Sequence, residues 1–252
     1  MLIVNADDWG GSRYITDQIL SCYKKGRLMS ASAMVYMEDS ERSAELARES
    51  GLEVGLHLNF TDRFTSHKAP SRTDESLSQV AAFFRKNKYY LVLYNPFLRR
   101  EFEYVFRCQY EEFIRLYGEP PAHINGHHHK HLCTNVLWAN ILPANSMVRR
   151  SFSFSPGEKS GLNRFYRYLV DRRLQQRNLC TDFFFSIEPL QASGRLQHIV
   201  TLAQSSNVEL MVHPQKQAEF NYLMSDQYMN LISGVEVGTY KGMMRGKVPP
   251  VR

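Results

Sequence analysis

The chain of 252 residues carries a formal net charge of +6, and 43% of its residues are hydrophobic. This composition supports a sizeable core and fits one large domain or two small ones. It contains no apolar run near the ~20 residues that cross a bilayer. Its four cysteines lie far apart, which excludes a C-x-x-C zinc knuckle and argues against a disulfide framework.

The first part of the chain alternates strand-like and helix-like patterns. Strands are predicted at 2–4, 30–36 and 52–58, with helices between them at 14–25 and 38–50. This β-α-β-α-β order is typical of a parallel sheet whose strands are joined by crossover helices.

A polar and then helical stretch follows the third strand. Residues 61–76 are predicted to form a loop or lid, and residues 77–117 are mostly helical with an interruption near Asn95. We expect a Tyr or Phe of this stretch to stack on a ring of a ligand. A further strand at 122–126 then runs into the histidine-rich stretch 127–131.

Short alternating elements occupy most of the remaining chain. Helices are predicted at 134–142, 164–177 and 195–204, and strands at 146–149, 182–187 and 208–212. Because no repeat or low-complexity linker marks a boundary, we predict one α/β domain over 1–252, with an insertion at about 61–117. The fold class is a parallel (β/α) barrel-like arrangement of six to seven strands.

Chemically active side chains follow four of the predicted strands. They are Asp7 with Asp8, His57, the histidines of 127–131, and His213. Because the carboxyl ends of parallel strands share one rim, we expect these side chains to meet there. Each one alone has an ordinary alternative: a capping aspartate pair, a hydrogen-bonded core histidine, or a residue that ends a strand.

The histidine run suggests a metal site, because neutral imidazole is a common ligand of divalent ions. Alternation along a strand would place His127, His129 and His131 on one side and His128 on the other. The alternative is a surface stretch that binds metal adventitiously.

Four stretches, in this order along the chain, resemble the signatures of the YdjC-like carbohydrate deacetylases, a family that includes bacterial chitooligosaccharide deacetylases. They are N-A-D-D-W-G at 5–10, G-L-H-L-N at 55–59, H-I-N-G-H-H-H-K-H at 123–131 and E-L-M-V-H-P at 209–214. The resemblance implies a deacetylase-type fold. It also implies removal of an N-acetyl group from an amino sugar or oligosaccharide, with release of acetate.

The resemblance also implies roles for individual residues. Asp8, His57 and His127 would hold one divalent ion, either Mg²⁺ or Zn²⁺, while Asp7 would act as catalytic base and His213 as catalytic acid. In an extended segment the two adjacent aspartates point apart, which fits separate roles.

Five further residues are expected near this chemistry. Arg149 is expected to keep Asp7 ionised. Family members commonly carry Asp at the position of Asn125 and Phe at the position of Trp9, and we expect Asn125 to orient His127 or His129. His129, His131 and Trp9 are expected to lie around the ion or the substrate.

Two rival functions remain open from the sequence. One is another metal-dependent hydrolase, such as a phosphoesterase, and the other is a non-catalytic carbohydrate-binding protein. The basic residues form isolated pairs, which favours surface charge over a nucleic-acid site, and leaves open an anionic substrate group or a membrane neighbour. The first residues do not resemble a signal peptide, so a cytoplasmic location is expected, and a homodimer is an open assembly state.

Overall fold

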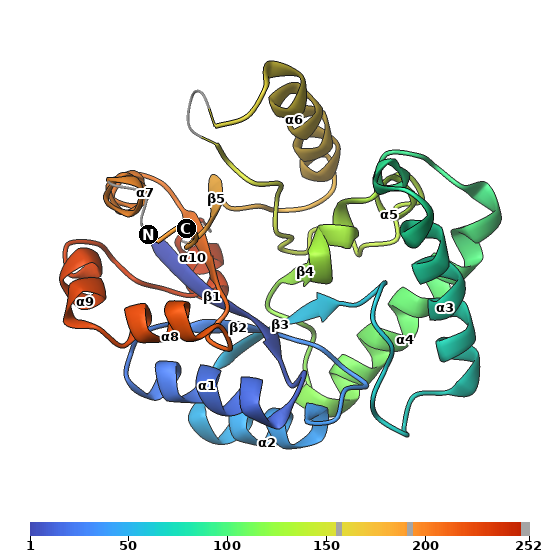
Figure 1. Cartoon of the computed structure of the whole chain (residues 1–252), viewed down its shortest axis with the longest axis horizontal. Coiled ribbons are helices and arrows are strands. Elements are labelled where there is room, and N and C mark those ends of the chain that lie inside the picture. Colours follow the sequence, from blue (N-terminus) through green and yellow to red (C-terminus); the bar gives the residue numbers. More distant parts are fainter. Residues whose placement is uncertain (155–157, 191–193, 248–252) are drawn as a thin grey trace, which may run out of the picture.

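The computed structural model describes residues 1–154, 158–190 and 194–247, and its centre is a curled sheet of six parallel strands (Figure 1). The strands are β1 (Leu2–Trp9), β2 (Ser30–Ala33), β3 (Glu53–Leu58), β4 (Ile124–Gly126), β5 (Phe183–Ser186) and β6 (Val208–Val212). Their order across the sheet is β4-β3-β2-β1-β6-β5. β1 is central and pairs in parallel with β2 and β6, because its residues 2–7 are buried and fit between two neighbours.

The two edges of the sheet approach each other through the segment after β4. Val148 forms a bridge with Ile124 of β4, and Met147 forms one with Leu179. The backbone N–H of Ser153 donates to the carbonyl oxygen of Phe184 in β5 over 2.8 Å. The predicted strand at 146–149 is therefore reduced to two bridging residues, and the predicted parallel barrel-like fold is confirmed.

Helices surround the curled sheet (Figure 1). They are α1 (Arg13–Lys24), α2 (Ser40–Ser50), α3 (Ser71–Lys86), α4 (Arg99–Tyr117), α5 (Thr134–Trp138), α6 (Gly161–Gln175), α7 (Arg195–Ala203), α8 (Gln217–Leu223), α9 (Asp226–Ile232) and α10 (Tyr240–Lys247). Three short 3₁₀ helices are η1 (Lys88–Leu91), η2 (Pro96–Leu98) and η3 (His127–Leu132). Within the described residues, no helix combines the length and the apolar character needed to cross a bilayer.

Three local expectations were wrong. Helix α3 begins at Ser71, so the predicted loop at 61–76 ends earlier than expected. Helix α5 ends at Trp138, well before the predicted residue 142. The histidine run forms η3 with positive φ at His128 and His129, so the side chains do not alternate as they would along a strand.

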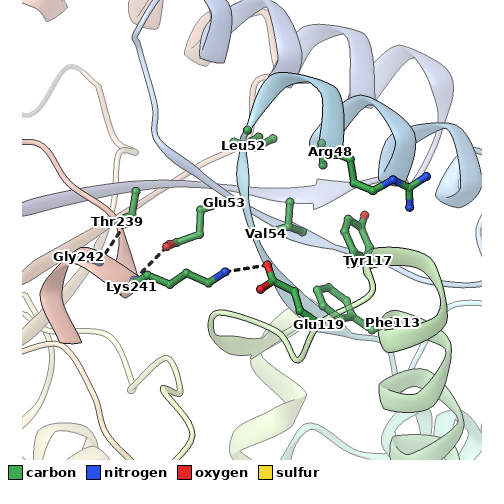
Figure 2. A pocket seen from close by; sticks show the side chains of 12 residues that line it. Arg48, Leu52, Glu53, Val54, Phe113, Tyr117, Glu119, Thr239, Lys241 and Gly242 are labelled. Atoms are coloured by element: carbon green, nitrogen blue, oxygen red, sulfur yellow. Dashed lines mark hydrogen bonds and ion pairs between the residues drawn. The ribbon is translucent and has the colours of Figure 1, made fainter. Parts of the chain in front are cut away.

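Helix α10 closes the end of the sheet opposite to the carboxyl rim. The Glu53 carboxylate accepts hydrogen bonds from the backbone N–H groups of Tyr240 and Lys241, at 2.7 and 2.9 Å. These N–H groups have no partner inside the helix, so the acceptor caps it. Figure 2 shows the cavity at this place, where Lys241 also pairs with Glu119. It lies at the amino end of β3, whereas His57 lies near the carboxyl end.

Candidate active site

The end of β1 brings two carboxylates to the rim by way of a backbone irregularity. The pairing of β1 with β2 shifts register between Ala6 and Trp9. Asp8 has a φ of 71°, in the left-handed region that side chains other than glycine rarely adopt. The segment is therefore not regularly extended at Asp8, contrary to expectation. Strain of this kind persists only where the surroundings enforce it, and it often accompanies function.

Asp8, His57 and His127 converge on one point. The Asp8 Oδ1 atom lies 3.2 Å from His57 Nε2 and 3.1 Å from His127 Nδ1. The two imidazole nitrogens are 3.4 Å apart. One donor atom from each residue lies within 4.8 Å of the others, so the set fits a single cation. A second group, Asp62 with His127 and His128, shares one ligand with the first.

Asn125 determines which ring nitrogen of His57 carries a proton. Its Oδ1 atom lies 2.7 Å from His57 Nδ1. Because an amide oxygen only accepts, Nδ1 carries the proton, and the lone pair of Nε2 points toward Asp8 and His127. This tautomer is the one that a metal ligand needs. Asn125 thus contacts His57, and not His127 or His129 as expected.

Two further contacts hold the cluster in place. The Gln215 Nε2 group donates to Asp8 Oδ2 over 2.8 Å, and Asp62 lies 3.3 Å from His127 Nε2. Burial raises the pKa of Asp8, but its contacts with the His127 and His57 imidazoles outweigh this effect and hold that pKa well below its usual range. The Asp8 carboxylate is therefore negatively charged at neutral pH and can serve as a cation ligand.

Asp7 forms a buried ion pair with Arg149. Arg149 donates from both terminal nitrogens to the two Asp7 oxygens, at 2.6 and 2.8 Å. Its Nε group donates to Glu209 over 2.5 Å. Burial raises the pKa of Asp7, but the Arg149 charge outweighs it and keeps the pKa well below its usual range. The carboxylate is thus ionised and held in one orientation.

Neutral side chains complete the surroundings of Asp7. The side-chain amides of Asn5 and Asn125 donate to Asp7 Oδ1, at 3.0 and 3.2 Å. Each amide also donates to the Ser32 hydroxyl oxygen, over 2.8 Å. The Ser32 hydroxyl lies 2.8 Å from His123 Nε2. Space for His123 depends on Gly55, where an added Cβ would lie 2.3 Å from the imidazole ring.

His213 at the end of β6 is paired with a buried carboxylate. Its backbone N–H donates to Glu219 over 2.6 Å, and its Nδ1 lies 3.6 Å from the other Glu219 oxygen. Burial lowers the pKa of His213, but Glu219 and Asp7 outweigh this effect, so the pKa is raised. A raised pKa favours the protonated imidazole, which is the form that a proton donor requires.

The remaining predicted residues have different surroundings. The His131 Nε2 group lies 3.0 Å from the Arg149 carbonyl oxygen, so His131 supports the arginine. The His129 ring lies 4.6 Å from Phe152, centroid to centroid. Trp9 is fully buried in the hydrophobic core and offers no surface to a substrate.

Seven polar partners were not predicted from the sequence: Asn5, Ser32, Asp62, His123, Glu209, Gln215 and Glu219. Glu209 had a local signal, since it is a charged residue inside an apolar strand and must be paired when buried. Asn5 and Gln215 lie within three residues of Asp8 and His213, respectively, in the sequence.

Over 138 residues the chain is 35% identical to a chitooligosaccharide deacetylase of Proteus mirabilis, covering 54% of this chain and 52% of that protein. A chitooligosaccharide deacetylase of Salmonella paratyphi B is 32% identical with the same coverage. The chain thus spans about half the length of the curated relatives it matches.

The fold is shared with a crystal structure from Enterococcus faecalis V583, of a protein named for cellobiose-phosphate cleavage. The TM-score is 0.68 with 20% sequence identity, and the likeness covers 96% of this chain and 98% of the other. Residues 1–234 match the family described as YdjC-like protein. Since this match covers most of the sequence and includes every residue of the site above, the chain belongs to the YdjC-like protein family.

Proposed function

We propose that this chain is a metal-dependent carbohydrate N-deacetylase, which hydrolyses the acetamide of an N-acetylated amino sugar or oligosaccharide and releases acetate. The observation that carries this proposal is the meeting of three functions at one rim. A cation-binding set, an ion-paired carboxylate and a protonatable histidine lie at the ends of β1, β3, β4 and β6. The names of the curated relatives support the same activity.

Asp8, His57 and His127 would hold the cation. Two nitrogens and one oxygen suit Zn²⁺, whereas Mg²⁺ usually takes more oxygen ligands, and both ions stay under consideration. When bound, a divalent ion there would polarise the acetyl carbonyl and lower the pKa of water.

Asp7 would accept the proton of the attacking water. Four hydrogen bonds from Arg149, Asn5 and Asn125 make its carboxylate a weak base but fix its position. Positioning of this kind contributes to the rate because the reacting groups need no further ordering. Arg149 and its partner Glu209 are therefore positioning residues in this proposal.

His213 would donate a proton to the departing sugar nitrogen. An amine leaves poorly as an anion, so amide hydrolysis needs an acid on that side. The Glu219 carboxylate stabilises the imidazolium before the transfer. A protein that only binds carbohydrate has no need of a base, a cation site and an acid at one place.

The test is a panel of N-acetylated amino sugars and chitooligosaccharides, with acetate quantified before and after treatment with a chelator. We expect acetate release that the chelator abolishes and added Zn²⁺ or Mg²⁺ restores. His57→Ala should be inactive, while the control His67→Gln changes an exposed histidine and should retain full activity. Phosphate release from sugar phosphates, without acetate from any member of the panel, would instead establish the phosphoesterase alternative.

A further inference from the structure

A cavity of about 580 Å³ lies beside the candidate metal cluster. Its walls come from η1, from η3 and from α6, three segments that are distant in the sequence. His128 belongs to the wall, and its ring centroid lies 4.1 Å from that of His127. The cavity therefore begins one side chain away from a proposed metal ligand.

The chemistry of the wall distinguishes the cavity from a site for more sugar. Its lining combines aromatic and polar side chains with five aliphatic ones, which are Leu91, Val92, Leu132, Leu162 and Val170. The aliphatic groups offer no hydrogen bonds, so sugar hydroxyls placed against them would lose their water without replacement. An apolar group on the ligand would instead gain from burial there.

The apolar surface continues beyond the cavity along α6. This helix buries only Asp171 and Leu174 among its described residues. Leu162 is 81% exposed, and Phe165 and Leu169, which lie three and seven residues further on the helix, are 57% and 46% exposed. Contiguous exposed apolar side chains of this kind mark a binding surface.

The same helix is cationic. It carries four arginines, Arg164, Arg167, Arg172 and Arg173, against one acidic residue, Asp171. Arg167 lines the cavity, and its guanidinium carbon lies 4.9 Å from the Phe154 ring centroid. The positive charge of Arg167 at the cavity complements an apolar ligand that carries an anionic or strongly polar group where its apolar part begins.

We infer that the cavity binds the apolar aglycone of an amphiphilic amino sugar, whose N-acetylated ring lies over Asp8, His57 and His127. This inference rests on the proposed deacetylase function and names its substrate class. The occupant is argued from the continuity of the cavity with the cluster, from its aliphatic wall and from the arginines of α6.

The experiment compares methyl and octyl β-N-acetylglucosaminide, which share the reacting sugar and differ in the aglycone. Both are used below micelle-forming concentration, and acetate is quantified. We expect kcat/KM to be at least about tenfold higher for the octyl compound, because extra methylenes are buried. Leu162→Asp should remove this preference by lowering kcat/KM for the octyl compound to the value for the methyl compound. The matched control Tyr168→Asp changes an exposed residue of α6 outside the cavity and should retain the preference.

Binding of octyl glucoside, which has no acetyl group, is measured in parallel by calorimetry. If no substrate releases acetate, but octyl glucoside binds the native protein and does not bind Leu162→Asp, then the proposed function is rejected and the cavity assignment is retained. Equal kcat/KM for the two glycosides, together with no octyl glucoside binding, would overturn the cavity assignment. Conversion of a dimer to a monomer by Leu162→Asp in sedimentation, without an effect on octyl binding, would assign the α6 surface to a second copy instead.

Discussion

Asp7 and Asp8 are adjacent in the chain, but their carboxylates have different partners. Asp7 binds Arg149, whereas Asp8 lies against His57 and His127. Asp8, unlike Asp7, has a positive φ. One dipeptide therefore supplies both a cation ligand and the proposed base.

Replacing each aspartate by asparagine separates these two roles. Asp7→Asn should lower kcat by on the order of 10²–10⁴-fold with the cation still bound, as expected when a general base is lost. Asp8→Asn should weaken cation binding, and high metal concentration should restore part of its activity. Turnover and metal affinity by calorimetry provide the measurements, with thermal unfolding as a check that both variants fold. Loss of the cation in Asp7→Asn and its retention in Asp8→Asn would contradict this assignment.

The position of these residues at the ends of apolar strands predicted that they would meet at one rim, and the family resemblance singled out Asp8, His57 and His127 as the ligand set. The structure brings Asp8, His57 and His127 together, and their roles stay predictions. The partners on β6 and α8 were missed. Glu209 binds Arg149, 60 residues away in the sequence, so no local spacing links that pair. Glu219 lies six residues after His213, but it belongs to α8, a helix that had no prediction.

At the scale of elements, the buried strands were predicted well and the short irregular segments were not. β6 at Val208–Val212 has the predicted bounds, because a continuous apolar run fits a fully buried parallel strand. Helices α8, α9 and α10 had no prediction. Two of them are only seven residues long, too short for a clear periodic pattern.

The insertion after β3 is tied to the strand end that carries His57. Gln109 of α4 accepts a hydrogen bond from the Asn59 N–H over 2.8 Å and donates to the Asn59 carbonyl over 2.9 Å. The loop before α3 reaches the site through Asp62 and His127. Phe64 packs edge-on against Tyr36, at 5.1 Å between centroids, so this ring is engaged within the protein. Sugar stacking by another ring of the insertion stays a prediction.

Removing the Gln109 side chain should loosen this strand end. Gln109→Ala leaves a buried N–H and a buried C=O without partners, which should lower the free energy of unfolding by on the order of 3 kcal/mol. Cation affinity should fall as well, since His57 lies two residues before Asn59. Urea denaturation and calorimetry measure both effects. Gln79→Ala on the exposed face of α3 is the matched control, with an expected change below about 0.5 kcal/mol. Native stability in Gln109→Ala would contradict this view of α4.

At the scale of the molecule, the parallel barrel-like fold followed from alternating patterns that tertiary packing did not override. The closing segment around Met147 and Val148 was harder to predict. It pairs through single bridges and not through a full strand, and a strand pattern in sequence does not reveal how many residues pair. The state of assembly stays a prediction, with the α6 surface as the place to test it.

Buried histidines should make the whole molecule sensitive to acid. Burial lowers the pKa of His131 to about 3, and burial together with the Arg149 charge lowers the pKa of His123 well below its usual value. Between pH 6 and pH 5 the unfolded chain therefore binds protons at these residues and the native state does not. The free energy of unfolding should fall with pH by up to about 1.4 kcal/mol per pH unit for each such histidine.

Urea denaturation of the metal-free protein at pH 6.0, 5.5 and 5.0 measures this dependence. His127 and His213 have raised pKa values, so they are protonated in both states across this range and contribute little to the slope. His131→Asn should reduce the number of protons taken up on unfolding by about one, and the slope falls accordingly, whatever the effect of the substitution on stability at pH 7. The control His67→Gln removes an exposed histidine and should leave the slope unchanged. The same slope in His131→Asn and the native protein would show that His131 takes up a proton without unfolding.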